Sequence, residues 1–514
     1  LLYQAVLEYS MGMEHRRVKA YLFYTRYPLL YPARSSWAMV RRVMDVRNRI
    51  VANEYAVQLK NNPEYTAEFL KAISPSLLNE RGLDNVLWKR YLLPSIEKVC
   101  GRLHSLSALE TAYFCTLYNF VTKEMYTAKS GDAEYGGRFG ASSLWLSTLE
   151  EKREAGEILY DLCIVQNHAA DEHKPFLVLS VSDVAEEEDV CILPNFREGD
   201  AVVLYERNKD ADNVTNKMVF KGNIESFTGN TVRLRLRASQ QNAGVLPAGS
   251  RYAIEHDYMD TSFRSMYNGL GAFLTATQAR RDLLLGQRLP EFDTSLDGRI
   301  ALAADDFSRI ALKAEAARDY FLLVGPPGTG KTSRALRAMV ENFYGRGGQL
   351  LLLSYTNRAV DEICKMLAGI RPSIDFIRIG SELACEPLYR PYLMENVLDA
   401  CGNRRAVRER IARCRVFVGT VATLSSKTDL FRLKTFDVAL VDEATQILEP
   451  QLLGLLCARD ASGKDAIGKF VLIGDHKQLP AVVLQPAGQS EVKDEALRDI
   501  GLLNLKDSLF ERLY

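Results

Sequence analysis

The stretch YFLLVGPPGTGKTSRALRAMV, residues 320–340, constrains the fold more than any other part of the chain. An apolar run from Phe321 to Val324 passes into a glycine-rich segment and then into a helical pattern with Leu336 and Met339 on one side. The segment fits G-x-x-x-x-G-K-[ST], in which backbone N–H groups turn inward around phosphate oxygens at the start of a helix. It predicts a strand, loop and helix that bind a nucleotide within a parallel α/β sheet.

This pattern also assigns roles within the loop. The nucleotide-binding residues expected from it are Gly325, Pro326, Pro327, Gly328, Thr329, Gly330, Lys331 and Thr332. Lys331 would reach the β- and γ-phosphates, and the Thr332 hydroxyl would bind Mg²⁺. We therefore expect ATP and Mg²⁺ as cofactors.

A second apolar run ends in an acidic pair, in FDVALVDEATQ from Phe436. A phosphate clamp needs a carboxylate for magnesium and a group that activates water, both at the end of a neighbouring strand. Asp442 is expected to hold the magnesium through its water shell, and Glu443 to accept the proton of the attacking water. The alternative, for either residue alone, is an ordinary acidic helix start.

A third apolar run, in FVLIGDHKQLP from Phe470, ends in a polar cluster. Ligands of open α/β sheets sit beyond the carboxyl ends of such strands. We expect this strand to belong to the same sheet, with its tip near Lys331 and Asp442. Gln478 would then reach toward the γ-phosphate or the attacking water.

The remaining pattern divides the chain. Helical periodicity marks residues 61–174, short strands with turn signals mark a small β-barrel over 175–256, a helical connector spans 257–300, and strands alternate with helices over 301–514. Within the barrel, Arg233, Arg235 and Arg237 alternate with leucines and share one strand face, either solvated or in contact with phosphates.

Composition and cysteine spacing narrow the class of protein and the kinds of site to expect. The 65 basic and 65 acidic residues cancel, so a nucleic-acid or membrane surface would have to be a local patch. Nine cysteines without a C-x-x-C pair suit a reducing, intracellular compartment, cytoplasmic if the protein is bacterial. Cys163, His168 and His173 fit no common metal-site spacing. The N-terminal LLYQAVLEYS lacks a basic leader and a cleavage site, and no apolar run approaches the roughly 20 residues of a membrane helix.

The glycine-rich loop, the acidic pair and GDHKQLP, in this order, resemble motifs I, II and III of superfamily 1 helicases. LLLSYTNRAVDEI from Leu351 resembles motif Ia, and VGTVATLSS from Val418 resembles motif Ic. The resemblance implies a RecA-like ATPase domain in which Gln478 senses the γ-phosphate and links hydrolysis to movement on nucleic acid. It also implies that Thr356, Asn357 and Thr420 contact the nucleic-acid backbone, although turn and cap roles compete for these three residues.

SYTNRAVD, VDEATQILEP and GDHKQLP further resemble the nuclease-helicases that process flapped DNA ends, in the 5′-to-3′ branch, and their bacterial relatives. That group places a small β-barrel before its first motor domain. Residues 1–60 resemble the tail of a RecB-like nuclease, with Gln4 and Tyr9 as candidates, but these lie five apart rather than the usual four. The metal-binding acid and the lysine would precede Leu1, so we expect no nuclease chemistry from this chain.

Two departures from the family affect what is expected. Family members carry an adenine-reading glutamine about 18 residues before the first loop glycine; here that position is Phe307, and no glutamine lies between Gln287 and Gly325. Either another group reads the base or base selectivity is relaxed.

After QLPAVVLQ only about 30 residues remain, too few for the second RecA-like domain expected in the parent protein. The chain alone is therefore expected to hydrolyse ATP slowly and to unwind nothing.

Three functions stay open at this point. The first is an ATP-driven helicase that binds single-stranded DNA. The second is a nucleotide-switch ATPase that controls a linked nuclease or an assembly. The third is an RNA helicase.

Overall fold

A computed structural model describes residues 2–25, 27–33, 36–131, 140–181, 195–258 and 261–514 of the chain. The chain forms two compact units, Leu1–Leu59 with Met125–Met259 and Lys60–Glu124 with Asp260–Tyr514. Within the described ranges, none of the helices is long and apolar enough to cross a membrane.

The larger unit is built on a six-stranded sheet. Its strands are β9 (Tyr320–Val324), β10 (Leu350–Ser354), β11 (Phe376–Ile379), β12 (Val416–Thr420), β13 (Phe436–Val441) and β14 (Ile467–Gly474). All neighbours pair in parallel, in the order β11-β12-β10-β13-β14-β9. The predicted parallel α/β sheet is confirmed.

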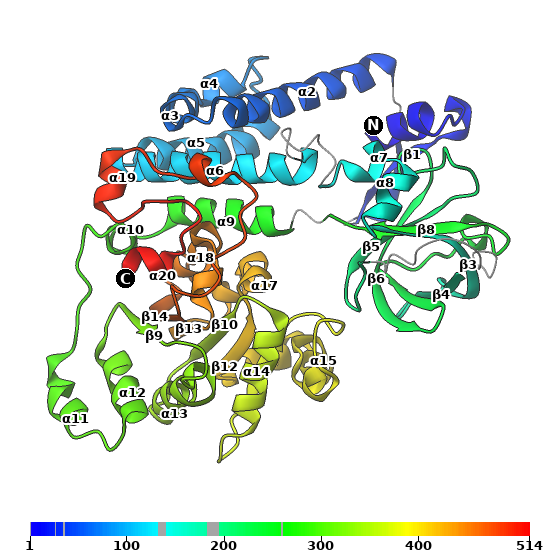
Figure 1. The fold of residues 1–514 in the computed structure, drawn as a ribbon. Coiled ribbons are helices and arrows are strands. Elements are labelled where there is room, and N and C mark those ends of the chain that lie inside the picture. Colours follow the sequence, from blue (N-terminus) through cyan, green and yellow to red (C-terminus); the bar gives the residue numbers. More distant parts are fainter. Residues whose placement is uncertain (1, 26, 34–35, 132–139, 182–194, 259–260) are drawn as a thin grey trace. The chain divides into compact units, whose positions relative to one another are not determined.

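Helices cover both faces of this sheet. Those of the larger unit are α3 (Pro63–Ala72), α4 (Pro75–Leu78), α5 (Leu93–His104), α6 (Ala108–Ser130), α9 (Thr261–Thr275), α10 (Gln278–Leu284), α11 (Asp297–Ala301), α12 (Asp306–Ala316), α13 (Arg337–Gly345), α14 (Asn357–Ala368), α15 (Met394–Asp399), α16 (Arg404–Arg413), α17 (Val421–Ser426), α18 (Glu449–Leu456), α19 (Glu495–Asp499) and α20 (Leu509–Leu513). In Figure 1, α12, α13 and α14 lie on one side of the strands and α9, α17 and α18 on the other.

The apolar strand sequences explain the two-sided burial. Side chains of successive strand residues point to opposite faces, and a parallel sheet covered on both faces needs apolar residues at every position. Accordingly, Leu350 and Leu352 pack in a core with residues of α13 and α14, whereas Leu351 and Leu353 pack in a second core with residues of α9 and α18.

One glycine sets the distance between α9 and α18. A Cβ atom added at Gly269 of α9 would lie 1.8 Å from the carbonyl oxygen of Pro450. The two helices therefore meet backbone to backbone, which fixes α18, the helix that follows the acidic pair, against the connector region.

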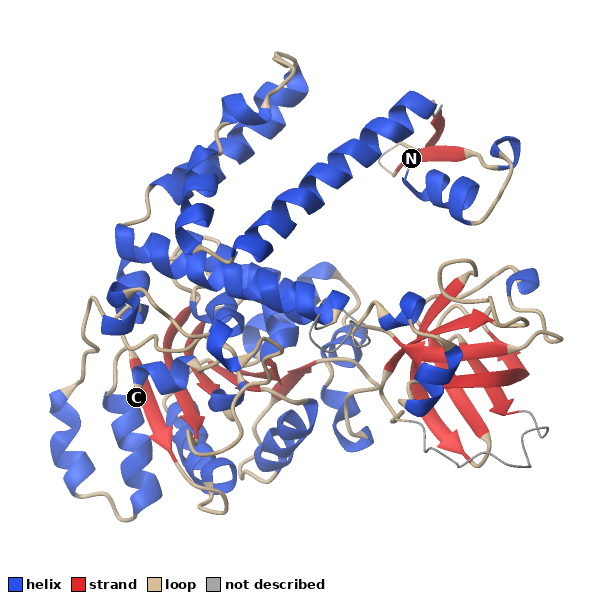
Figure 2. Cartoon of the chain, turned by 45° about the horizontal axis from the view of Figure 1, so that its top comes forward, coloured by secondary structure: helices blue, strands red, loops and turns tan. Residues whose placement is uncertain are grey.

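The smaller unit contains a closed β-barrel. The elements of this unit are α1 (Leu2–Ala5), β1 (Ala20–Tyr24), β2 (Leu29–Ala33), α2 (Trp37–Lys60), α7 (Ser143–Leu146), α8 (Leu149–Glu154), β3 (Ile158–His168), β4 (Phe176–Val181), β5 (Ala201–Glu206), β6 (Val219–Thr228), β7 (Thr231–Leu236) and β8 (Tyr252–His256). The barrel closes in the order β3-β4-β7-β6-β5-β8, and its strands are drawn in red in Figure 2. The predicted small barrel is confirmed.

The barrel begins before residue 175, because β3 lies in a stretch that the sequence pattern assigned to the helical region 61–174. The pairing of β3 with β8 shifts register between Leu159 and Leu162, and Asp161 within this shift has a φ of 55°. Such a bulge breaks the two-residue alternation of a strand, which explains why the pattern concealed β3.

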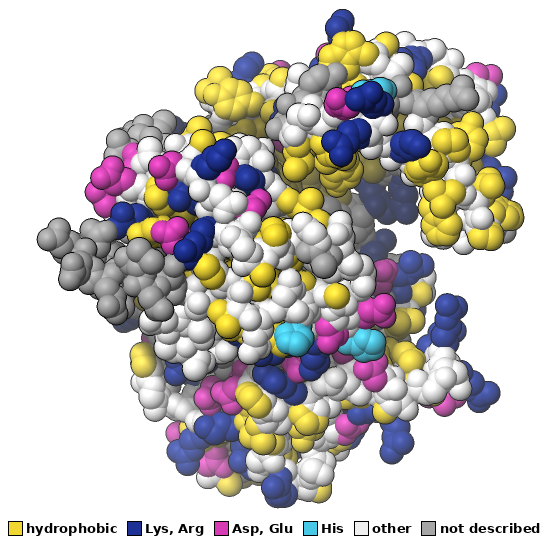
Figure 3. Space-filling view, turned by 90° about the vertical axis from the view of Figure 1, so that its right-hand side faces the viewer, with side chains coloured by type: hydrophobic (Ala, Val, Ile, Leu, Met, Phe, Trp, Pro, Cys, Tyr) yellow, Lys and Arg dark blue, Asp and Glu magenta, His cyan; other side chains and the backbone are white. Residues whose placement is uncertain are grey.

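The three barrel arginines are ion-paired. The Nε atom of Arg233 lies 2.7 Å from a Glu225 oxygen, Arg235 bonds the same carboxylate, and Arg237 lies 3.2 Å from Asp257. Basic and acidic side chains also lie interspersed on the face of the molecule shown in Figure 3. The arginine row is therefore matched by carboxylates of its own unit.

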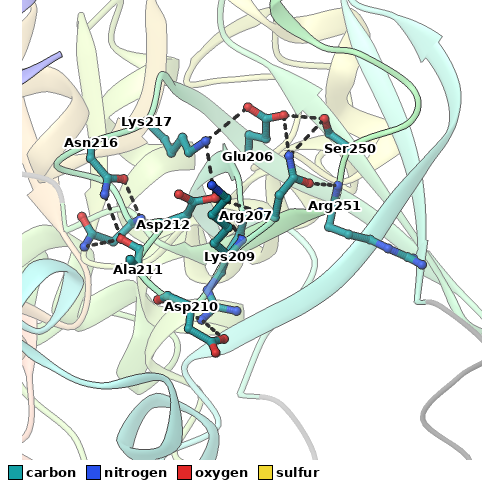
Figure 4. Close-up of polar contacts among 12 residues, drawn as sticks. Glu206, Arg207, Lys209, Asp210, Ala211, Asp212, Asn216, Lys217, Ser250 and Arg251 are labelled. Carbon is teal, nitrogen blue, oxygen red and sulfur yellow. Dashed lines mark hydrogen bonds and ion pairs between the residues drawn. The ribbon is translucent and has the colours of Figure 1, made fainter. Parts of the chain in front are cut away.

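A polar network fixes the loop between β5 and β6 (Figure 4). Asp212 accepts hydrogen bonds from the backbone N–H groups of Asn208 and Lys209, both at 3.0 Å, and lies 3.4 Å from the Lys217 ammonium. Glu206 accepts from the hydroxyl of Ser250, two residues before β8 begins. These contacts stabilise an exposed loop that has few apolar side chains to bury.

A buried ion pair ties together three segments of the larger unit. Arg512 of α20 donates to both oxygens of Glu449 in α18, at 2.9 Å from Nε and 2.6 Å from a terminal nitrogen. The Tyr113 hydroxyl of α6 donates to the same carboxylate. Since the side chains of Arg512, Glu449 and Tyr113 are all buried, the charges of Arg512 and Glu449 each depend on the other for compensation.

We expect Arg512→Met to destabilise the larger unit by about 3–5 kcal/mol, because it leaves the Glu449 carboxylate buried without a counter-charge. Urea denaturation would measure this loss. Arg405→Ala is the matched control, because the Arg405 pair with Glu409 is exposed and should contribute under about 1 kcal/mol. Equal losses in the two variants would contradict the assigned role of the buried pair.

Candidate nucleotide site

The loops that follow β9, β10, β13 and β14 meet at the carboxyl edge of the sheet. Strand β14 lies between β13 and β9, with Leu472 opposite Val441 and Gly474 opposite Val324. The backbone N–H of Gly325 donates to the carbonyl oxygen of Gly474 (3.1 Å). The structure thus brings the three sequence stretches with predicted chemistry to one edge.

The phosphate loop depends on its glycines. Gly328 and Gly330 adopt φ angles of 78° and 83°, which side-chain-bearing residues rarely adopt. A Cβ atom at Gly325 would lie 2.7 Å from Cγ of Lys331. The Lys331 side chain therefore folds back over Gly325, and the helical segment Lys331–Leu336 begins directly at the loop.

Thr332 and Asp442 form the contact that is expected to hold a metal. The Thr332 hydroxyl donates to an Asp442 carboxylate oxygen at 2.5 Å, although the two residues lie 110 positions apart. Burial raises the pKa of the Asp442 carboxyl, while the hydrogen bonds from Thr332 and the Glu443 N–H and the charge of Lys331 lower it. A bound divalent cation would favour the ionised form of this carboxyl.

This donor set fits magnesium. Among the described residues, no group of three or more His, Cys, Asp or Glu side chains is placed to hold a metal ion. Mg²⁺ commonly uses one or two protein oxygens together with waters and substrate phosphates. The hydroxyl of Thr332 and the carboxylate of Asp442 suit that mode.

Glu443 occupies a strained position beside this pair. Its φ of 56° lies in the left-handed region, a conformation that costs about 1–3 kcal/mol and clusters at functional sites. Burial and then the charge of Asp442 raise the pKa of Glu443, whereas a hydrogen bond from Ser354 (3.4 Å) and the charge of Lys331 lower it. Ser354, fully buried at the end of β10, was not singled out from the sequence, because a lone serine ending a strand carries no motif.

A cavity of about 700 Å³ opens at this edge. Its lining comes from the phosphate loop, the acidic pair and the facing sides of the helices after β9 and β10, including Lys331, Thr332, Arg337, Thr356, Arg358, Asp442 and Glu443. Gln478 instead donates its side-chain amide to Asp475 (3.1 Å) within its own loop. In the structure, the predicted sensor amide is therefore bound to a neighbouring carboxylate.

The predicted nucleic-acid contacts lie on the loops after β10 and β12. Thr356 accepts from the backbone N–H of Ala359 and caps α14, and Thr420 accepts from that of Thr423 and caps α17, both at 3.2 Å. Thr420 is buried, and Asn357 is exposed in the first turn of α14. The cap role considered for these positions is thus observed for both threonines.

Phe307 lies in the first turn of α12, which is capped by Asp305. The Arg334 guanidinium, three residues beyond Lys331, sits 4.9 Å from the centre of the Phe307 ring. The position expected to read the base therefore carries an arginine on an aromatic ring, beside the phosphate loop.

Because a phenyl ring cannot form the paired hydrogen bonds of an amide, we expect weak discrimination between bases. GTP should bind within roughly a hundredfold of ATP. Phe307→Gln should widen this gap, whereas Phe307→Leu should not. Isothermal titration with Mg-ATP and Mg-GTP measures both effects, and strong rejection of GTP by the unmodified chain would show that another group reads the base.

Comparison with known proteins matches the region that contains these residues. A family model described as an AAA domain matches residues 303–402 and 393–486. The DNA replication ATP-dependent helicase/nuclease DNA2 of Gallus gallus is 25% identical over 552 residues, covering 99% of this chain and 50% of that protein. DNA2 of Homo sapiens is 23% identical over 547 residues, covering 99% of this chain and 47% of that protein.

Other relatives match shorter regions. The DNA replication ATP-dependent helicase/nuclease JHS1 of Arabidopsis thaliana is 32% identical over 263 residues, covering 49% of this chain and 19% of that protein. Among solved structures, the UvsW helicase from bacteriophage T4 aligns over 39% of this chain and 58% of that chain, at 14% identity and a TM-score of 0.25. That score is too low to carry an argument.

The chain spans half or less of the length of the DNA2 proteins from Gallus gallus and Homo sapiens. The aligned region nevertheless covers 99% of this chain in both cases. The family resemblance inferred from the motifs is confirmed: this chain is similar to the superfamily 1 helicases of the DNA2 helicase/nuclease family.

Proposed function

We propose that the larger unit contains the first RecA-like motor domain of an ATP-dependent DNA helicase. The contact between Thr332 and Asp442, with Glu443 beside it, is the observation that carries this proposal. It joins a phosphate loop to an acidic pair across 110 residues, as hydrolysis of a nucleoside triphosphate requires. The relatives named above are described as ATP-dependent helicase/nucleases of DNA replication.

Each residue of the site has a proposed part. Lys331 and the loop N–H groups bind the phosphates, and Thr332 and Asp442 hold Mg²⁺, which neutralises charge on the phosphates when bound. Glu443 accepts the proton of the attacking water. Gln478 couples the state of the γ-phosphate to the strand-binding surface, which requires its amide to leave Asp475.

Single-stranded DNA is the proposed track. Thr356, Asn357 and Thr420 lie on two loops at the carboxyl edge of the sheet, and we propose that they contact the strand backbone. In the caps both hydroxyls accept a backbone N–H, and the Thr420 O–H also donates to the Thr423 hydroxyl (2.7 Å). Because phosphate oxygens only accept, the contacts would use the Thr356 O–H or adjacent backbone N–H groups.

Apart from β3 (Ile158–His168), which belongs to the barrel, the boundaries given by the sequence remain proposals: a RecB-like nuclease tail over 1–60, a helical region over 61–174, the barrel over 175–256, a connector over 257–300 and the ATPase domain over 301–514. Within the tail, Gln4 donates to Glu8 (2.8 Å), and the side chain of Tyr9 lies outside what the structure describes. A second RecA-like domain of the same parent protein is the proposed partner that supplies an arginine to the γ-phosphate, an effect worth about 10³ to 10⁵ in rate.

Substitutions in the phosphate site test the proposal directly. Lys331→Ala should abolish turnover and weaken nucleotide binding, because it removes the positive charge that binds the β- and γ-phosphates. Glu443→Gln should preserve binding and trap the ATP state, because only the proton acceptor is lost. ATPase rates and nucleotide affinities measured on the parent protein check both outcomes, and near-normal hydrolysis by Glu443→Gln would exclude this residue as the base.

Binding of single strands distinguishes a DNA helicase from the two alternative functions, a nucleotide switch and an RNA helicase. We expect matched DNA and RNA single strands, compared by competition at one stated salt concentration, to favour DNA by about tenfold or more. Strand-stimulated ATPase and duplex unwinding by the parent protein should accompany this preference. A nucleotide switch would show neither stimulation nor unwinding, and an RNA helicase would reverse the preference.

A further inference from the structure

Arg358 lies in the first turn of α14, one residue after Asn357, and its side chain is exposed. It lines the same cavity as Lys331 and Glu443. None of the sequence motifs assigns this arginine a role. Its place in the wall of this cavity raises the question of which charge it meets.

The ion pairs of the cavity distinguish Arg358 from other cations in its wall. Arg337 is engaged by Glu341 (2.9 Å), and Lys365 lies 3.9 Å from Glu362. Among the described residues, neither Lys331 nor Arg358 forms an ion pair. Two cations of the cavity therefore stay available for an anionic ligand.

Strand pairing indicates on which side of the cavity Arg358 lies. β10 pairs directly with β13, and the hydroxyl of Ser354 at the end of β10 donates to Glu443. The first turn of α14 begins three residues later, so it lies on the Glu443 side of the cavity. The start of this 12-residue helix adds positive potential there.

We propose that Arg358 binds the terminal phosphate of a nucleoside triphosphate, which makes the site selective for the triphosphate over the diphosphate. This rests on the proposed function, because Glu443 acts on water next to the γ-phosphate. Lys331 approaches that phosphate from the phosphate loop, and Arg358 approaches it from α14. A guanidinium is suited to this role because its planar fork donates two hydrogen bonds to phosphate oxygens.

Affinities of the 514-residue chain for Mg-ADP and for a non-hydrolysable Mg-ATP analogue test the proposal, measured by isothermal titration. Arg358→Ala should weaken binding of the analogue by about 10- to 100-fold, the usual loss for a hydrogen bond to a charged group. Binding of ADP should change by no more than about twofold. Arg358→Lys, which keeps the charge without the fork, should recover part of the loss.

Arg405→Ala provides the matched control, since Arg405 is an exposed arginine of α16 paired with Glu409. It should alter neither affinity. Thermal unfolding of each variant checks that the fold is intact, and Arg358→Lys carries the test if the alanine variant does not fold.

Two outcomes would overturn the assignment of Arg358. One is an equal loss of ADP and analogue binding, which would indicate a general electrostatic effect. The other is an unchanged nucleotide preference together with weaker binding of single-stranded DNA, which would place Arg358 on the strand. If the unmodified chain binds neither nucleotide, the proposed ATPase site itself is wrong, and the role of Arg358 is wrong with it.

Discussion

The parallel pairing of β14 with both β13 and β9 is the constraint on which the site depends. It places the ends of three strands at one edge, although Lys331 and Asp442 lie 111 positions apart in sequence. Apolar residues on both faces of these strands drive this arrangement, because burial of each strand requires helices above and below it. The polar residues that follow these strands then lie together at the carboxyl edge of the sheet.

Charge burial is the cost of this arrangement. Asp442 and Glu443 are adjacent in sequence and both have raised pKa values, chiefly because burial disfavours their ionised forms. Thr332, Ser354 and Lys331 offset part of that cost. The left-handed conformation of Glu443 adds backbone strain at the same point, so the acidic pair is a region of reduced stability, as strained positions at functional sites commonly are.

The segment after the acidic pair is held from several directions. Glu449 of α18 is bound by Arg512 and Tyr113, and Gly269 allows α9 to approach α18 closely. His476 of the GDHKQLP loop also stacks on Tyr514 of the C-terminal segment (4.8 Å between ring centres). Both α18, through Glu449, and this loop, through His476, therefore contact the C-terminal segment that holds Arg512 and Tyr514.

Local patterns were enough to predict the glycine-rich loop, the acidic pair, the apolar strands and most of the barrel. Loop glycines and strand periodicity are patterns of residues that are close in sequence, so they can be recognised without knowing which distant residues they contact. Strand β3 was missed because a bulge interrupts its alternation. Three features could not be settled from local pattern and depend on the folded structure: helices of 60–124 join the larger unit, Thr356 and Thr420 act as helix caps, and Gln478 is bound to Asp475. The fold likewise places Arg358 in the cavity wall with no ion pair to any residue that the structure describes, because the pairing of a charge depends on neighbours that the fold brings in from distant positions.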